Sequence, residues 1–316
     1  MKPYLLILGG FATLYIGGEL FMKGAVTISK RLRIPPLLIG LTIASLATSM
    51  PEIMVGISSS LEGVPDLAVG SVVGTNIVNV FLILALAALI MPIVVDRVAI
   101  RQNLIMMIIA STALFFVGVL AGQIDRFIGA LFLIALVGYY LYSYYHALNK
   151  DEHPEEVLDD IKDFSSIGLA LLFIFFAVIA LFLGSDWLVI GASSIATQFG
   201  LTEAVIGLTI VAFGTSLPEL TLCVIGALRG HSEIAFGNIV GSHIINIFAV
   251  LGIASMIKPI PINPSLTRFD IPLLLFLTLV LAVVLEWRGK LNRTTAVVFL
   301  LIYISYIIVT YTGVLS

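Results

Sequence analysis

The sequence predicts an all-α polytopic membrane protein in which ten transmembrane helices form two inverted five-helix repeats. The first observation is composition: 60% of the 316 residues are hydrophobic and 11% are charged, values that are not typical of soluble domains. The second is an internal repeat with an offset of 167 residues. A net charge of −3 without a basic patch excludes nucleic-acid binding as the main activity. The single cysteine, Cys223, lies in an apolar run and is expected to be a core residue.

The ten helices are predicted from hydrophobic runs long enough to cross about 30 Å of hydrocarbon. In chain order they cover residues 4–29, 36–60, 67–92, 103–122, 127–147, 166–193, 203–228, 234–257, 270–286 and 294–313. The first run contains Glu19 and Lys23 and belongs to the repeat, so we expect a membrane helix there and not a signal peptide. Helices 2, 3, 7 and 8 are expected to be broken helices at the core.

Basic residues are distributed unevenly between the loops. With the N-terminus outside, the cytoplasmic side receives eleven of them: Lys30, Arg31, Arg33, Arg97, Arg101, Lys150, Lys162, Arg229, Arg288, Lys290 and Arg293. The outer side receives four: Lys2, Arg126, Lys258 and Arg268. Because cytoplasmic loops carry the excess of Lys and Arg, this distribution predicts a multi-pass protein of the cell membrane with both termini outside.

An acidic stretch from Lys150 to Asp163 is predicted to be the centre of a cytoplasmic linker, 148–165, between the repeats 1–147 and 166–316. It lacks the spaced oxygen ligands and the turn glycine of an EF-hand loop. A solvated linker is therefore favoured over a regulatory cation site.

The repeat aligns residues 17–80 with 184–247 without a gap, and 21 of these 64 positions are identical. The best-matched motifs are "GLTIASLATSMPE" (40–52) with "GLTIVAFGTSLPE" (207–219), and "GSVVGTNIVN" (70–79) with "GNIVGSHIIN" (237–246). Five predicted helices separate the copies. Because five is odd, the copies cross the membrane in opposite senses, as in secondary transporters whose substrate site lies near the midplane.

Each copy carries an acidic residue inside a membrane helix. Glu52 follows Thr48 by four residues, so both share a helix face, and Ser49 lies beside them. Thr215, Ser216 and Glu219 repeat the pattern. An acidic side chain at a helix centre costs about 3 kcal/mol on insertion scales. A protonated structural Glu could explain one such residue, but a matched pair favours function.

A proline precedes each glutamate. Pro51 and Pro218 remove a backbone hydrogen bond and free the carbonyls of Ala47 and Gly214. A packing kink is one interpretation, and a broken helix whose carbonyls bind cations is the other. Placement beside an acid in both copies favours the second.

Helices 3 and 8 add further oxygen donors at i, i+4 spacing: Thr75 with Asn79, and Ser242 with Asn246. Four glycines are expected to keep the helix backbones close: Gly70, Gly74, Gly237 and Gly241. Carboxylates, amides, hydroxyls and freed carbonyls are hard donors, and no thiolate or histidine pair accompanies them. The sequence therefore predicts a site for a hard cation such as calcium or sodium.

These motifs, above all "GTSLPE" and "GNIVGSHIIN", resemble the calcium/cation antiporter superfamily and in particular its prokaryotic sodium/calcium exchangers. The resemblance implies antiport of sodium against calcium through one alternating-access site, with the transported ions in place of cofactors. The implied calcium ligands are Glu52 and Glu219 with the backbone carbonyls of Thr48 and Thr215. The implied sodium ligands are Ser45, Thr48, Ser49, Glu52, Thr75, Asn79, Ala212, Thr215, Ser216, Glu219, Ser242 and Asn246, where Ser45 and Ala212 stand for nearby carbonyls.

The sequence departs from the family pattern at three positions. Ala47 replaces a glycine, His243 stands where asparagine is frequent, and Asn246 stands where some exchangers carry aspartate. His243 is either a proton sensor or a hydrogen-bonded structural residue. Glu19 and Asp186 correspond under the offset, and both are left out of the predicted site.

Four alternatives to sodium/calcium exchange remain at this point. A proton-coupled antiporter is the runner-up, potassium-dependent exchange stays open, and a channel is separated from both by its lack of coupling. An intramembrane protease using Ser216, Ser242 and His243 is disfavoured because the histidine is not duplicated. The expected partners are calcium, sodium and the lipid bilayer, without nucleic acid, an obligate protein partner or enzymatic activity.

Overall fold

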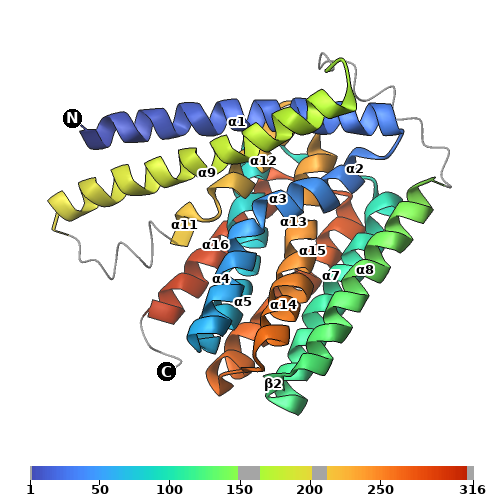
Figure 1. The fold of residues 1–316 in the computed structure, drawn as a ribbon, viewed down its shortest axis with the longest axis vertical. Helices are drawn as coiled ribbons and strands as arrows, with labels where there is room; N and C mark the ends of the chain where they lie inside the picture. Colours follow the sequence, from blue (N-terminus) through green and yellow to red (C-terminus); the bar gives the residue numbers. More distant parts are fainter. Residues whose placement is uncertain (1, 149–163, 201–211, 312–316) are drawn as a thin grey trace.

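The computed structural model describes residues 2–148, 164–200 and 212–311. The predicted linker lies almost entirely outside these residues, as does the start of the second motif, 207–211. In Figure 1, the two long helices α1 (Lys2–Leu32) and α9 (Ile167–Gln198) run side by side across the top, and the other helices form a bundle below them.

The remaining elements are helical except for four strands of two residues each; π-helical turns carry the label η. Those of the first half are α2 (Pro36–Ile39), η1 (Gly40–Ala44), α3 (Ser45–Thr48), α4 (Met50–Glu62), α5 (Pro65–Val78), η2 (Asn79–Ile83), α6 (Leu84–Ile90), β1 (Ile93–Val94), α7 (Arg97–Phe116), η3 (Val117–Ala121), β2 (Gln123–Ile124) and α8 (Arg126–Leu148). Those of the second half are α11 (Ala212–Gly214), α12 (Leu217–Leu228), α13 (Ser232–Ile245), η6 (Asn246–Val250), α14 (Leu251–Ile257), β3 (Ile260–Pro261), η7 (Leu266–Asp270), α15 (Ile271–Arg288), β4 (Lys290–Leu291) and α16 (Arg293–Tyr311).

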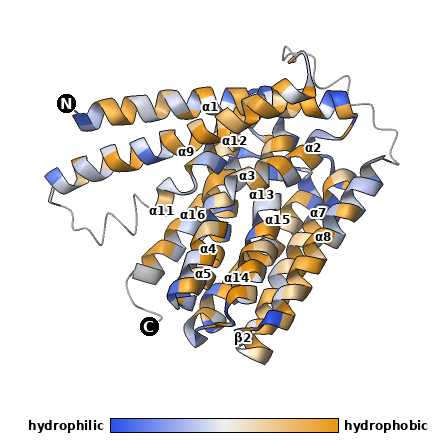
Figure 2. Ribbon diagram, in the orientation of Figure 1, coloured by the Kyte–Doolittle hydropathy of each residue, from blue (hydrophilic) through white to orange (hydrophobic). Residues whose placement is uncertain are grey.

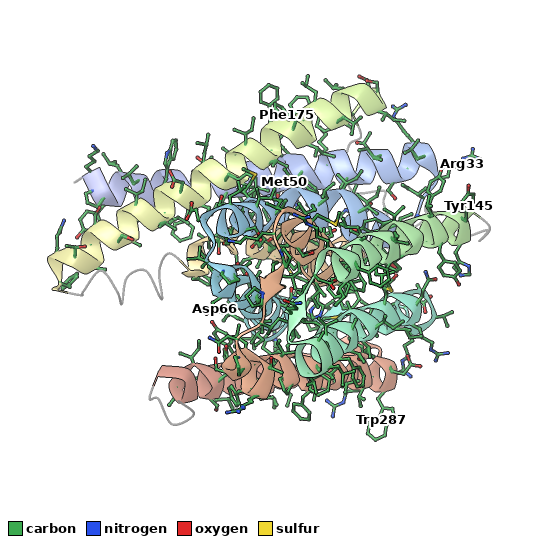
Figure 3. All side chains as sticks on the ribbon, turned by 60° about the horizontal axis from the view of Figure 1, so that its bottom comes forward. Arg33, Met50, Asp66, Tyr145, Phe175 and Trp287 are labelled. Atoms are coloured by element: carbon green, nitrogen blue, oxygen red, sulfur yellow. The ribbon has the colours of Figure 1, made fainter. Side chains whose placement is uncertain are left out.

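The outer surface of the bundle is apolar. Among the described residues, seven helices are long and apolar enough to cross a membrane, and the bent pair Pro36–Thr48 and Met50–Glu62 makes an eighth span. Large side chains such as Phe175 and Trp287 are 60% and 81% exposed and project outward in Figure 3. Hydrophilic residues gather mainly at the helix ends (Figure 2). A surface of this kind is stable only in lipid, so the chain is a membrane protein.

The structure repeats with the offset found in the sequence. Adding 167 to the bounds of α5, η2, α6 and β1 gives those of α13, η6, α14 and β3. The same offset maps one strand pair onto the other. It takes β1 to β3 and β2 to β4, and β1 pairs with β4 while β2 pairs with β3, both antiparallel. The register agrees as well: Ile93 lies opposite Leu291, and Ile260 lies opposite Ile124.

Small residues let α1 and α9 approach closely. A Cβ on Gly10 would lie 2.8 Å from the carbonyl oxygen of Gly184, and one on Gly17 would lie 3.0 Å from that of Ala177. The two contacts are equivalent in the repeat, because the offset of 167 takes Gly10 to Ala177 and Gly17 to Gly184. Small-residue packing of this kind lets membrane helices associate where lipid removes the hydrophobic driving force.

Helix 2 is broken as predicted, but helices 3 and 8 are not. The chain bends by 46° between α3 and α4, at Ser49. Residues Pro65–Ile90 and Ser232–Ile257 instead run as continuous spans that each contain one π-helical turn. The physical reason is the absence of an internal proline there, so a local π-helical turn accommodates the asparagine without breaking the helix.

The two strand pairs lie at opposite ends of α7, because β1 precedes this helix and β2 follows it. Arg293 donates to the carbonyl of Leu89 near β1, whereas Arg126 donates to that of Ile257 near β3. Arg293 and Arg126, which the sequence assigns to opposite membrane faces, therefore lie at opposite ends of α7.

Candidate cation site

Glu52 and Glu219 occupy the same position in two helices, the first turn of α4 and of α12. Each helix begins after a serine with non-helical backbone, Ser49 (φ −83°, ψ 5°) and Ser216 (φ −94°, ψ 6°). The proline before each glutamate lies in the first turn, where its missing N–H costs nothing. Both carboxylates thus sit at helix N-termini, where free N–H groups favour negative charge.

Both carboxylates are buried without a partner. Glu52 is 3% exposed and Glu219 is 0% exposed, and none of their four oxygens has a hydrogen-bond partner among the described residues. The helix of Glu219, α12, packs against α3, which ends directly before Ser49 and the helix of Glu52. Two buried carboxylates without partners cost several kcal/mol unless protons or a cation compensate them.

Further polar groups in the same region lack partners. Ser49 and Asn79 are fully buried, and the Ser49 hydroxyl and both polar atoms of the Asn79 side chain make no hydrogen bond to the described residues. The Asn246 Oδ1 is likewise buried and unpartnered. Within the described part of the chain, no group of three or more His, Cys, Asp or Glu side chains could hold a metal ion. The donors are therefore two carboxylates with neutral oxygens, which suits a hard cation.

Asn76, which the sequence analysis did not select, orients Asn246. The Asn246 Nδ2 donates to the Asn76 Oδ1 at 3.1 Å, and the Asn76 Nδ2 donates to the carbonyl of His243 at 3.4 Å. With its nitrogen held by Asn76, Asn246 has its Oδ1 left for an ion. Asn76 stands in the first-copy motif, but only its position in the folded chain reveals this contact.

His243 is hydrogen-bonded through one of its two ring nitrogens. Its Nε2 lies 2.7 Å from the hydroxyl of Ser111 on α7, and Ser111 lies 3.2 Å from the hydroxyl of Thr278 on α15. Ser111 and Thr278 correspond under the offset of 167, so the two hydroxyls meet where the repeats contact each other. The geometry supports the structural alternative for His243 and ties it to neither Ser216 nor Ser242.

The first-half side of the site is closed. Thr48 is 1% exposed; its hydroxyl donates to the Asn238 Oδ1 at 3.2 Å and lies 3.4 Å from that of Ser242. The Ser45 hydroxyl donates a hydrogen bond to the carbonyl of Leu41, at 2.6 Å. As predicted, Gly237 and Gly241 allow close packing, whereas a Cβ on Gly70 or Gly74 would meet nothing within 4 Å.

The second-half side of the site borders a cavity among the described residues. Thr215 is exposed and lines a cavity of about 200 Å³ together with Pro51 and Pro218. Ser216 is buried, Thr75 is half-buried, and the side chain of Ala212 lies outside the described residues. The Gly214 carbonyl, which the sequence predicts to lack a backbone donor, accepts a hydrogen bond from the Ser185 hydroxyl of α9. A hydroxyl from a neighbouring helix can satisfy a carbonyl that has no backbone donor.

The chain matches a known family over nearly its full length. The family model described as "Sodium/calcium exchanger protein" matches residues 2–145 and 169–312. The chain belongs to the sodium/calcium exchanger family. It is therefore a membrane transporter and not an enzyme, and it handles transported ions in place of cofactors.

Relatives of this exchanger cover similar lengths. It is 34% identical to the inner membrane protein YrbG of Escherichia coli over 289 residues, which are 90% of this chain and 88% of YrbG. It is 28% identical to the sodium/calcium exchanger MaX1 of Methanosarcina acetivorans, over 98% of each chain. Among solved structures, the sodium-calcium exchanger NCX_Mj matches with a TM-score of 0.83 and 27% identity, over 97% of this chain and 98% of NCX_Mj.

Proposed function

We propose that this exchanger is an antiporter that moves sodium against calcium through one central site. The observation that supports it is the pair of buried, unpartnered carboxylates of Glu52 and Glu219 beside neutral oxygens. Calcium takes 6–8 oxygen ligands including carboxylates, and sodium accepts the same neutral oxygens. Both ions thus compete for one set of donors, which is what exchange requires.

The ligand assignment follows the two motifs. Calcium is held by Glu52 and Glu219 with the backbone carbonyls of Thr48 and Thr215. Sodium ions use these residues together with Ser49, Thr75, Asn79, Ser216, Ser242 and Asn246, and with carbonyls near Ser45 and Ala212. The free Oδ1 of Asn246 and the unpartnered polar atoms of Asn79 support this assignment most directly.

The architecture that we propose has ten spans in two inverted repeats, 1–147 and 166–316, joined by a cytoplasmic linker at 148–165. Two shorter apolar helices, Leu217–Leu228 and Arg293–Ile308, would raise the number of spans from eight to ten. The exchange of strand partners and of the α1–α9 contacts under one offset supports a two-fold relation between the halves.

The two halves of the site differ in access, which supports alternating access. Thr48 and Thr215 are equivalent in sequence, yet the first is buried against α13 and the second faces a cavity. If Thr215 became buried and Thr48 became exposed, one side of the site would close and the other would open. Such rocking of one repeat against the other is how inverted-repeat transporters work.

Flux measurements test the function. The purified protein, reconstituted in sodium-loaded liposomes, is diluted into sodium-free buffer that contains radiolabelled calcium. Uptake is expected to require internal sodium and to survive a protonophore, because the coupling ion is sodium. Abolition by the protonophore without a need for sodium would assign the protein to the proton-coupled antiporters, and uptake without any counter-ion gradient would indicate a channel.

Single cysteines test the orientation. Asp66→Cys and Lys290→Cys are introduced separately into a Cys223→Ala background, because these two exposed positions lie at opposite ends of the bundle. An impermeant thiol reagent applied to intact cells is expected to label Asp66→Cys and to leave Lys290→Cys unlabelled until the cells are opened. The reverse pattern would invert the proposed topology.

A further inference from the structure

Asp186 is an acidic residue of a membrane-spanning helix and has no partner among the described residues. It lies 12 residues before the end of α9, about 18 Å along the helix axis at 1.5 Å per residue. The side chain makes no hydrogen bond or ion pair with any residue that the structure describes, and it is exposed beside a cavity. A carboxylate at such depth is stable only if it faces water or a cation, because hydrocarbon does not solvate it.

The corresponding residue of the first half has a different environment. Glu19, which is 167 positions before Asp186, accepts hydrogen bonds from Arg229 at 2.7 and 2.9 Å. The position equivalent to Arg229 in the first half is Glu62, which cannot form such a pair with Asp186. Glu19 is therefore paired with Arg229, whereas the second repeat provides no equivalent basic partner for Asp186.

Asp186 shares its cavity with the edge of the cation site. The cavity of about 200 Å³ is lined by Asp186, Ser185, Thr215 and the prolines that directly precede the two buried glutamates, Pro51 and Pro218. No basic residue lines it. A mainly apolar cavity with one carboxylate concentrates cations, because apolar walls screen the field poorly.

We propose that Asp186 captures the cation at the mouth of the path that leads from the membrane face at which α9 ends to Glu52 and Glu219. It acts on the approaching ion and is not a ligand of the central site. This inference rests on the proposed function, because the central site is the destination of the captured ion. Under the proposed topology, the face concerned is the external one.

Transport kinetics from each face test the proposal, with Asp186→Asn as the variant. When calcium is applied to the face at which α9 ends, kcat/KM is expected to fall about three- to tenfold through a higher KM at unchanged kcat. The loss should shrink in 0.5 M choline chloride, since salt screens the attraction. Right-side-out and inside-out vesicles separate the two faces, and calcium applied to the other face should show no change.

Three comparisons make the result specific. Asp186→Glu keeps the charge and should retain the wild-type KM, and Glu19→Gln, the matched variant of the other repeat, should leave the KM unchanged. Equilibrium binding of radiolabelled calcium to the detergent-solubilised protein should keep its Kd within about twofold in Asp186→Asn, because steering changes association and dissociation together. A large loss of binding would make Asp186 a ligand and overturn the proposal.

An unchanged KM from both faces, or an equal loss from both, would also contradict capture by Asp186. These outcomes are distinct from a failure of sodium/calcium exchange. If a proton gradient drives the calcium flux, the same KM comparison applies to that flux, and the role of Asp186 is tested while the sodium assignment fails.

Discussion

Glu52→Gln and Glu219→Gln are each expected to lose nearly all calcium exchange, and the double variant should be scarcely worse than either single one. Each substitution keeps the size of the side chain and removes one negative charge from a fully buried site. Loss of a direct carboxylate ligand there should exceed the roughly 1.4 kcal/mol that corresponds to a tenfold change in affinity. Residues that act as one unit are not additive, so the second substitution adds little.

Sodium-dependent uptake of radiolabelled calcium measures this effect, and the elution profile on size-exclusion chromatography checks folding. Both variants should fold, since a neutral amide is less costly to bury than an ion. Glu62→Gln is the matched control, because Glu62 is the last residue of α4 and is exposed. Near-normal flux in Glu52→Gln alone would give Glu52 a structural role and contradict the symmetric site.

Gly237→Ala is expected to destabilise the protein. A Cβ at this position would lie 2.5 Å from the carbonyl oxygen of Leu37 and 3.0 Å from the backbone nitrogen of Leu41. Backbone atoms cannot move aside as a flexible side chain can, so α13 must separate from α2 and η1. Overpacking of this kind costs about 1–3 kcal/mol, which should lower the melting temperature in detergent by several degrees.

Gly70→Ala is the control for this substitution, because Gly70 is the equivalent residue of the first repeat and a Cβ there meets nothing within 4 Å. Its melting temperature should stay close to that of the wild type. If both variants were destabilised equally, the difference in packing between the two halves of the site would not exist in solution.

Most of the membrane helices and the acidic pair could be predicted from the sequence. Hydrophobic runs of membrane-spanning length identify helices without reference to their neighbours, because lipid imposes the same requirement on every span. The offset of 167 residues matched Glu52 to Glu219, and the folded chain places both in the first turn of a helix. Proline at Pro51 correctly predicted the break in helix 2, since its effect on the backbone is local.

Contacts between distant segments were not predictable from local patterns. Ser111 with His243 and Asn76 with Asn246 join residues that are 132 and 170 positions apart. A polar residue in an apolar run signals that some partner exists, but its identity depends on how the helices pack. The break predicted for helices 3 and 8 failed for another reason: neither span has an internal proline, and a π-helical turn accommodates the asparagine.

The sequence by itself determined the membrane environment, the repeat and the pair of glutamates, because these follow from hydropathy, identity and spacing along one chain. Only the tertiary structure decided which half of the site borders a cavity among the described residues. Thr48 and Thr215 occupy equivalent positions of related motifs, yet one donates to Asn238 of α13 and the other lines the cavity of Asp186. These contacts depend on which helices pack against each copy, and a local motif does not specify that packing.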